Sequence, residues 1–217
     1  MGLESVLSAG LNQLGLNCSL AVQAQLRDYV HLINKWNRVY NLTSVRDPAE
    51  MVTRHLLDSL AILPYLQGSR VLDVGTGAGL PGLPLAIVNK EISPEREFVL
   101  LDSNSKKTRF VQQVIAELGL TNVQVVHERA ENYSPTRLFD VVVSRAFASV
   151  ADMLKNSGQH CATDGVILAM KGIDPVDELQ EVSAIFENKF IVEAVHSVNV
   201  PGLEGQRHVV CLKLFNH

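Results

Sequence analysis

The fold is decided by Val71-Leu72-Asp73-Val74-Gly75-Thr76-Gly77-Ala78-Gly79-Leu80-Pro81-Gly82. Its first four residues are typical of a buried strand, and its alternate glycines allow backbone conformations that a Cβ would forbid. A helix that starts after such a turn offers unpaired N–H groups to a ligand. This stretch therefore predicts a buried strand, a tight turn that approaches a ligand, and a helix.

Seven short apolar runs predict strands, at residues 70–74, 97–102, 123–127, 139–144, 165–170, 190–198 and 208–215. Helix-length segments separate the first five, for example residues 105–118, which Gly119 closes. This alternation indicates crossover helices and a buried parallel sheet. Residues 201–206 are too few for a crossover, so the last two strands should pair as an antiparallel hairpin.

Helical spacing of apolar residues predicts that the beginning of the chain is helical. One helix covers residues 3–14, and a longer one runs from the N-cap Ser19 to Tyr40. A third starts at Asp47-Pro48-Ala49-Glu50, with Asp as the N-cap and Pro at the first helical position, and continues to Leu63. We therefore divide the chain into an N-terminal helical extension, residues 1–65, and a sheet domain, residues 66–217.

Composition places the chain among ordinary soluble globular proteins, with 217 residues, 47% hydrophobic and 19% charged. We recognise neither a membrane span nor a leader in the sequence, so we expect a cytoplasmic protein. We also expect a monomer. Its three cysteines are far apart, which favours reduced thiols and no metal site. The net charge is −4, so a nucleic acid would have to be bound by a local cluster of cations.

Two cofactor classes compete for the glycine turn. Residues 77–82 spell G-x-G-x-x-G, the dinucleotide fingerprint, but that motif has its first glycine at the strand end. Here the strand ends at Gly75, two residues after Asp73, and this D-x-G-x-G-x-G form resembles motif I of class I methyltransferases that use S-adenosyl-L-methionine. Asp102, at the end of the second strand, suits the ribose of either cofactor or caps a helix. Glu131, after the third strand, lies either near an adenine or in a solvated turn.

The fourth strand ends in Ser144-Arg145-Ala146-Phe147. The Asp/Asn-Pro-Pro-aromatic turn of amino-methylating enzymes is absent there, and so is a cysteine nucleophile. Arg145 and, at the end of the fifth strand, Lys171 are therefore interpreted as binding cations at one edge of the sheet. We expect them to act in catalysis by positioning, without a general base.

Several blocks together resemble one family: Asn41-Leu42-Thr43-Ser44, Arg54-His55-x-x-Asp58-Ser59, residues 74–82, Leu101-Asp102-Ser103, Ser144-Arg145-Ala146-Phe147, Lys171-Gly172 and Arg207-His208. They occur in the order found in the ribosomal RNA small subunit methyltransferase G family, also called glucose-inhibited division protein B. The resemblance implies a class I methyltransferase with a Rossmann-like, seven-stranded, mostly parallel sheet. It also implies methyl transfer from S-adenosyl-L-methionine to guanine N7 in bacterial 16S rRNA, at position 527 in the usual numbering.

The resemblance assigns cofactor contacts to Gly75, Leu80, Ala130, Glu131 and Arg145. The turn and the second strand end complete this candidate set with Asp73, Thr76, Gly77, Gly79, Asp102 and Ser103. The expected partner is 16S rRNA, either as naked RNA or within the small ribosomal subunit. We expect it to be bound by a cluster of cations: Arg54, His55, Lys106, Arg109, Arg145, Lys171 and Arg207. The alternatives are a methyltransferase of a protein or small molecule, an NAD-dependent oxidoreductase, or a non-catalytic nucleotide-binding module.

Overall fold

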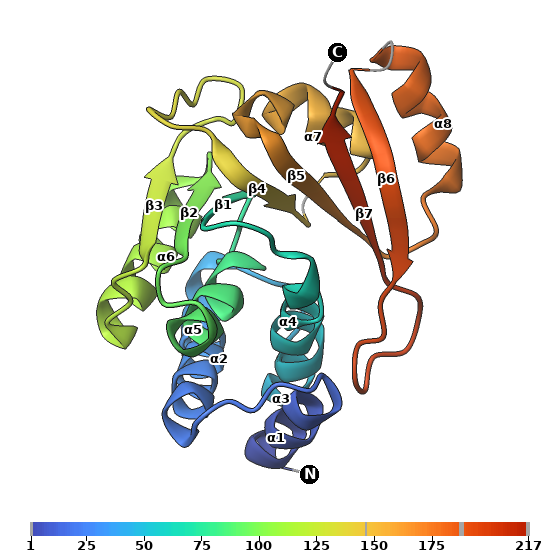
Figure 1. The fold of residues 1–217 in the computed structure, drawn as a ribbon. Helices are drawn as coiled ribbons and strands as arrows, with labels where there is room; N and C mark the ends of the chain where they lie inside the picture. Colours follow the sequence, from blue (N-terminus) through green and yellow to red (C-terminus); the bar gives the residue numbers. More distant parts are fainter. Residues whose placement is uncertain (1, 146, 187–188, 216–217) are drawn as a thin grey trace.

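The computed structural model describes residues 2–145, 147–186 and 189–215 (Figure 1). Its N-terminal part contains α1 (Leu3–Gln13), α2 (Leu20–Tyr40), α3 (Pro48–Met51), a π-helical turn (Val52–Leu57), α4 (Asp58–Leu60) and a 3₁₀ turn (Leu63–Tyr65). Ser19 caps α2 by accepting a hydrogen bond from the Val22 N–H at 3.2 Å, as the sequence predicts. Asp47 likewise caps α3.

Within the described residues, the sheet contains seven strands in the order β3-β2-β1-β4-β5-β7-β6. Their bounds are β1 (Arg70–Val74), β2 (Glu97–Asp102), β3 (Val123–His127), β4 (Phe139–Ser144), β5 (Cys161–Lys171), β6 (Phe190–Ser197) and β7 (His208–Leu214). β7 pairs antiparallel with both β5 and β6, whereas the other described strand pairs are parallel, so the expected terminal hairpin is confirmed. Strand order reverses between β1 and β4, and ligands of such sheets bind beyond the carboxyl ends of the strands at that point.

Helices cover both faces of the sheet and form two apolar cores. On one face, α5 (Gly82–Ile92) and α6 (Ser105–Leu118) pack together with the N-terminal helices (Figure 1). On the other face lie α7 (Val150–Ser157), the 3₁₀ turn Gly158–His160 and α8 (Val176–Ile185). The first core joins Leu26 of α2 to Leu83 of α5 and Phe110 of α6. This core continues across residue 65. The division of the chain into residues 1–65 and 66–217 therefore stays a prediction.

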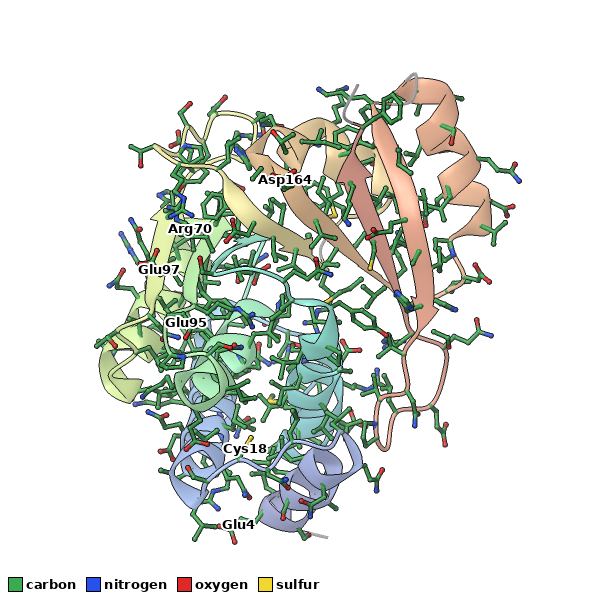
Figure 2. The ribbon with its side chains drawn as sticks, viewed as in Figure 1. Glu4, Cys18, Arg70, Glu95, Glu97 and Asp164 are labelled. Carbon is green, nitrogen blue, oxygen red and sulfur yellow. The ribbon has the colours of Figure 1, made fainter. Side chains whose placement is uncertain are left out.

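Polar contacts occupy the amino ends of β1, β2 and β4. The guanidinium of Arg70, at the start of β1, stacks on the Phe139 ring with its Cζ 4.5 Å from the ring centre. Its Nε lies 3.7 Å from Oε2 of Glu97, at the start of β2 (Figure 2). Asp140 accepts hydrogen bonds from the N–H groups of Ser69 and Arg70 at 2.8 and 2.9 Å. These contacts stabilise the amino edge.

Two local predictions are wrong in detail. The segment between β3 and β4 is turns and coil instead of a crossover helix, because residues 128–138 are mostly exposed and present no apolar stripe. The helix expected from Pro48 to Leu63 is interrupted by the π turn Val52–Leu57 and ends at Leu60. Ala146, part of the block after β4, lies outside the described residues.

No helix within the described ranges is long and apolar enough to cross a membrane. In the same part of the chain, no group of three or more His, Cys, Asp or Glu side chains is arranged to hold a metal ion. The three cysteines are free thiols, with Cys161 and Cys211 buried and Cys18 half-buried between α1 and α2 (Figure 2). Burial raises the pKa of Cys18 to about 11 and that of Cys161 to about 12, so neither is a thiolate nucleophile at neutral pH.

Candidate functional site

The glycine turn after β1 is held against the end of β2. Gly75 and Gly77 have φ of 69° and 60°, a region that side chains rarely adopt. The N–H groups of Gly75 and Thr76 donate to the carbonyl of Leu101 at 2.8 and 3.1 Å. The turn therefore lies where β1 and β2 both end.

Asp73 shapes this turn through hydrogen bonds from its buried side chain. Its side chain is fully buried, and Oδ2 accepts hydrogen bonds from the Thr76 hydroxyl at 2.6 Å and from the Gly82 N–H at 2.8 Å. Burial raises its pKa to about 6. Asp73 and Gly79 do not line the three cavities described below, and an added Cβ at Gly79 would collide with Leu83. Both residues shape the turn, and their expected role as cofactor contacts stays a prediction.

Asp102, at the end of β2, links the turn to α6. Its side chain is 6% exposed; Oδ2 accepts from the Gly77 N–H and Oδ1 from the Asn104 N–H, both at 2.8 Å. Asn104 is itself the N-cap of α6, so Asp102 is not needed as the cap. The Lys107 ammonium lies 3.9 Å from Oδ2. A carboxylate offers about four acceptor positions, so the two N–H groups do not exhaust those of Asp102.

The N-terminal helices also support the turn. Tyr29 of α2 is fully buried, and its hydroxyl donates to the carbonyl of Ala78 at 2.7 Å. This contact is not predicted from the sequence. The available signal was a hydroxyl-bearing aromatic within the apolar stripe of α2, next to Val30.

Three adjoining cavities open at the carboxyl edge of the sheet. The first, the acidic cavity, has a volume of about 260 Å³ and is lined by Gly75, Asp102, Ser103, Ala130, Glu131 and neighbours. The second, the glycine cavity, has about 180 Å³ and is lined by Gly75, Thr76, Gly77, Leu80, Arg145 and neighbours. The third, the arginine cavity, has about 390 Å³ and includes Arg54, Asp58, Arg145, Lys171 and Arg207. Gly75 joins the first to the second, and Arg145 joins the second to the third.

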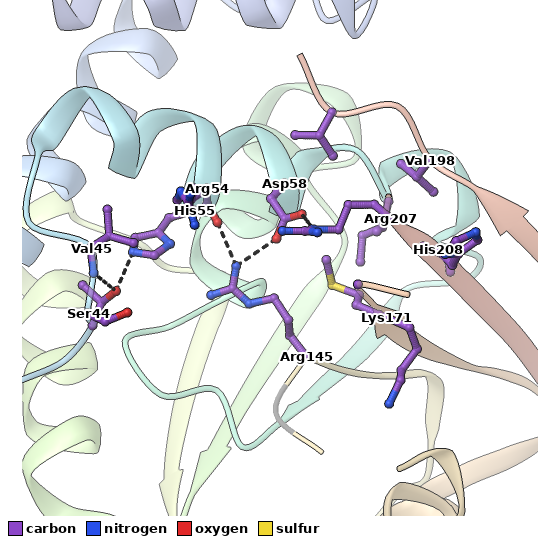
Figure 3. A pocket seen from close by; sticks show the side chains of 16 residues that line it. Ser44, Val45, Arg54, His55, Asp58, Arg145, Lys171, Val198, Arg207 and His208 are labelled. Carbon is purple, nitrogen blue, oxygen red and sulfur yellow. Dashed lines mark hydrogen bonds and ion pairs between the residues drawn. The ribbon is translucent and has the colours of Figure 1, made fainter. Parts of the chain in front are cut away.

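The arginine cavity contains an ion cluster drawn from three distant segments (Figure 3). Asp58, only 5% exposed, receives the Arg145 Nη1 on Oδ2 at 3.0 Å and the Arg207 Nε on Oδ1 at 2.9 Å. Arg145 Nη1 also donates to the main-chain carbonyl of Arg54 at 3.1 Å. The side chains of Arg145 and Arg207 are 27% and 30% exposed, and both line the cavity.

The predicted cation cluster is only partly brought together. Arg54, His55, Arg145, Lys171 and Arg207 line the arginine cavity, whereas Lys106 and Arg109 lie outside it, exposed on α6. His55 is not a cation at neutral pH, because burial and the Arg145 charge lower its pKa to about 4. Its Nε2 lies 2.9 Å from the Thr43 hydroxyl.

Lys171 also differs from expectation. Its ammonium group pairs with Glu178 of α8 at 2.9 Å and donates to the carbonyl of Ala148 at 2.8 Å. Glu178 in turn accepts from the Val150 N–H at the start of α7. Lys171 therefore ties the loop after β4 to α8, and its charge is already neutralised by a partner.

This geometry suits binding and orientation more than proton transfer. The histidine at the junction has a low pKa, and the carboxylate beside it is occupied by two arginines. Asp102 lines the acidic cavity next to the glycine turn, an arrangement that fits the ribose of an adenosyl group.

Comparison with known proteins agrees with this geometry. The family model for rRNA small subunit methyltransferase G matches residues 22–210. The chain belongs to this family. It is 49% identical over 210 residues to the family member of Nitrosococcus oceani, covering 97% of this chain and 94% of that protein. It is 50% identical over 206 residues to that of Ectopseudomonas mendocina, covering 94% and 92%.

Solved structures agree on the fold. A methyltransferase of Aquifex aeolicus that depends on S-adenosylmethionine superposes with a TM-score of 0.58 at 20% identity, covering 80% of this chain and 97% of that one. As a member of the methyltransferase G family, the chain is an enzyme that uses S-adenosyl-L-methionine. The oxidoreductase alternative loses its support, and the G-x-G-x-x-G match at residues 77–82 is incidental.

Proposed function

We propose that this member of the family transfers a methyl group from S-adenosyl-L-methionine to N7 of a guanine in 16S rRNA of the bacterial small ribosomal subunit. The observation that carries the proposal is the junction at Arg145. There, a cavity beside a glycine turn meets a cavity lined by arginines. A nucleoside cofactor suits the cavity beside the glycine turn, and an anionic polymer suits the arginine cavity.

The cofactor is assigned to the acidic and glycine cavities. Asp102 would accept hydrogen bonds from the two ribose hydroxyls, and Ala130 and Glu131 would lie beside the adenine. The turn at Gly75 and Gly77 allows the amino-acid end of the cofactor to approach the backbone. Thr76, Leu80 and Ser103 complete the walls. When bound, the cofactor supplies an electrophilic methyl group on a sulfonium.

The proposed chemistry needs no general base. Guanine N7 is an unprotonated acceptor, so no proton has to leave before it attacks. The chain then contributes mainly alignment of the reacting atoms, which is worth up to ~7 to 11 kcal/mol in favourable cases. Arg145 is placed to orient both reactants because it lines both cavities. Lys171 contributes indirectly, by holding the segment after β4 through Ala148.

Ribosomal RNA is expected to bind despite the net charge of −4, because affinity for RNA depends on local contacts with phosphates. Arg54, Arg145 and Arg207 supply such contacts around the arginine cavity. Lys106 and Arg109 extend the surface along α6, which starts at the same edge of the sheet. We propose a monomeric enzyme that acts in the cytoplasm, where ribosomal subunits are assembled.

Base analogues at the target position test the reacting atom. RNA with 7-deazaguanine lacks the N7 lone pair but keeps the Watson–Crick edge, so it should not be methylated. RNA with inosine keeps N7 and should retain activity. Transfer of radiolabelled methyl groups in single turnovers gives both rates, with unmodified RNA as the control. Methylation of the deaza substrate would refute the N7 assignment, and so would loss of activity on inosine together with a basic limb in the pH profile.

A further inference from the structure

Asp58 is a negative charge at the centre of a cavity expected to bind a polyanion. Its carboxylate is 5% exposed, yet it belongs to the lining of the arginine cavity. Charge repulsion alone would disfavour a carboxylate at this position. Asp58 therefore needs an explanation beyond the binding of RNA to cations.

The geometry offers one. Each carboxylate oxygen receives one guanidinium, Arg145 from the end of β4 and Arg207 from the loop that precedes β7 (Figure 3). Arginine side chains have many rotamers, and ordering one at the moment of binding costs free energy. A buried carboxylate shared by two arginines orders both before any ligand arrives. It does so by linking the N-terminal helices, the middle of the sheet and the terminal hairpin.

Neither guanidinium is used up by Asp58. Arg145 donates to Asp58 through Nη1, and Arg207 donates to Asp58 through Nε and to the carbonyl of Gln206 through Nη1. Each arginine has further N–H groups and is partly exposed toward the cavity. Two guanidinium groups on one carboxylate leave a net charge of +1, which suits one phosphate group.

We propose that Asp58 is a positioning residue that holds Arg145 and Arg207 in the orientation in which they bind a phosphate group of the RNA near the target guanine. This inference rests on the proposed function, because it takes RNA as the ligand of the arginine cavity. Asp58 itself touches neither RNA nor cofactor. It acts through the two arginines.

A positioning role for Asp58 and a simple sum of charges predict opposite changes in RNA affinity when Asp58 is neutralised. Asp58→Asn raises the charge of the cavity by one unit. If charges merely add, RNA binding becomes tighter and its dependence on salt becomes steeper. If Asp58 positions the arginines, binding weakens and the salt dependence becomes shallower, because fewer phosphate contacts are ordered.

The experiment measures the dissociation constant for unmethylated small ribosomal subunits at several KCl concentrations. For Asp58→Asn we expect a constant at least tenfold higher than for wild type, and a salt slope that is lower by about one unit, because one phosphate contact is lost. Glu181→Gln, which makes the same charge change at an exposed position on α8, should change neither quantity. Tighter or unchanged binding by folded Asp58→Asn protein would overturn the proposal.

Two further variants separate the positioning role of Asp58 from a general effect on folding. If Asp58→Asn does not fold, Asp58→Glu keeps the charge and displaces it by one methylene, so weaker binding at unchanged net charge supports positioning, and unchanged binding refutes it. In an Arg207→Gln background, changing Asp58 should cost less than it does alone, because residues that act together are not additive. Full additivity would place Asp58 outside this arginine pair.

The proposed function is checked separately, by methylation of the same subunits with the wild-type protein. If the wild type does not label guanine N7, the proposed function fails, whatever Asp58 does to RNA binding. If the wild type labels N7 and Asp58→Asn binds RNA normally, only the positioning role fails. A raised KM for subunits with a smaller change in kcat would agree with positioning of a binding group.

Discussion

Asp102→Ala should affect cofactor affinity and stability by similar amounts. From the sequence alone, the expected loss is mainly in affinity, because the carboxylate is assigned to the ribose hydroxyls. The structure adds two backbone contacts, from the N–H groups of Gly77 and Asn104, both at 2.8 Å. Alanine removes the acceptor for all of these donors together.

The magnitudes follow from counting hydrogen bonds. Two backbone contacts at about 1 kcal/mol each predict that the free energy of unfolding falls by about 2 kcal/mol. Two ribose contacts of the same strength predict a dissociation constant for S-adenosyl-L-methionine that is roughly 30-fold higher. Displacement of the Gly77 turn would add to the second effect, since this turn lines the glycine cavity.

Calorimetric titration with the cofactor measures the affinity, and urea denaturation followed by circular dichroism measures the stability. Asn104→Ala is the matched control, because it removes the N-cap of α6 and costs about 1 kcal/mol of stability without touching the expected ribose site. The reasoning is refuted if folded Asp102→Ala protein binds the cofactor within threefold of wild type. Asp102 would then only brace the turn.

Three other perturbations test separate parts of the site. Tyr29→Phe leaves the buried carbonyl of Ala78 without its donor, so urea denaturation should show a loss of about 1 to 3 kcal/mol; an unchanged midpoint would contradict the bracing role. Burial lowers the pKa of His55 from 6.5 to about 4, so the unfolded chain takes up the proton first and stability should fall as pH drops through this window. The loss is about 2 kcal/mol between pH 7 and pH 5, and His55→Gln should lack it when the two proteins are compared by denaturation. Arg54→Gln should lower the salt slope of RNA binding by about one unit with cofactor affinity unchanged, and a change in cofactor affinity alone would count against a phosphate contact.

Much of the sheet could be predicted because its strands are short, apolar and clearly bounded. The first four begin and end at the expected residues. β1, β2 and β4 are largely buried and have a nearly continuous apolar pattern, whereas β3, at the edge of the sheet, has no buried residue. The segment after β3 could not be predicted in the same way. An alternation of strands implies that a crossover exists, but only an apolar stripe shows that it is helical, and residues 128–138 have none.

Within the site, the positions of residues were easier to predict than their partners. The strand ends place Asp102 and Arg145 on one edge, as periodicity indicates. That Lys171 pairs with Glu178, or that His55 is buried and neutral, depends on packing between elements far apart in the chain. Asp73 shows the same limit, because a residue two positions before the turn can face the ligand or the core, and its environment decides which.

The π turn at Val52–Leu57 makes the register of Asp58 sensitive to the length of the chain. An α-helix rotates by about 100° per residue, and a π turn accommodates about one residue more than an α turn. Deleting one residue within the π turn would allow ordinary α-helical geometry there and would keep Asp58 on the same face of the helix. An inserted residue has no such outlet, and would turn the carboxylate by about 100°, away from Arg145 and Arg207. A single-codon insertion here is therefore expected to be as damaging as loss of the carboxylate itself, whereas a single-codon deletion is expected to be tolerated better.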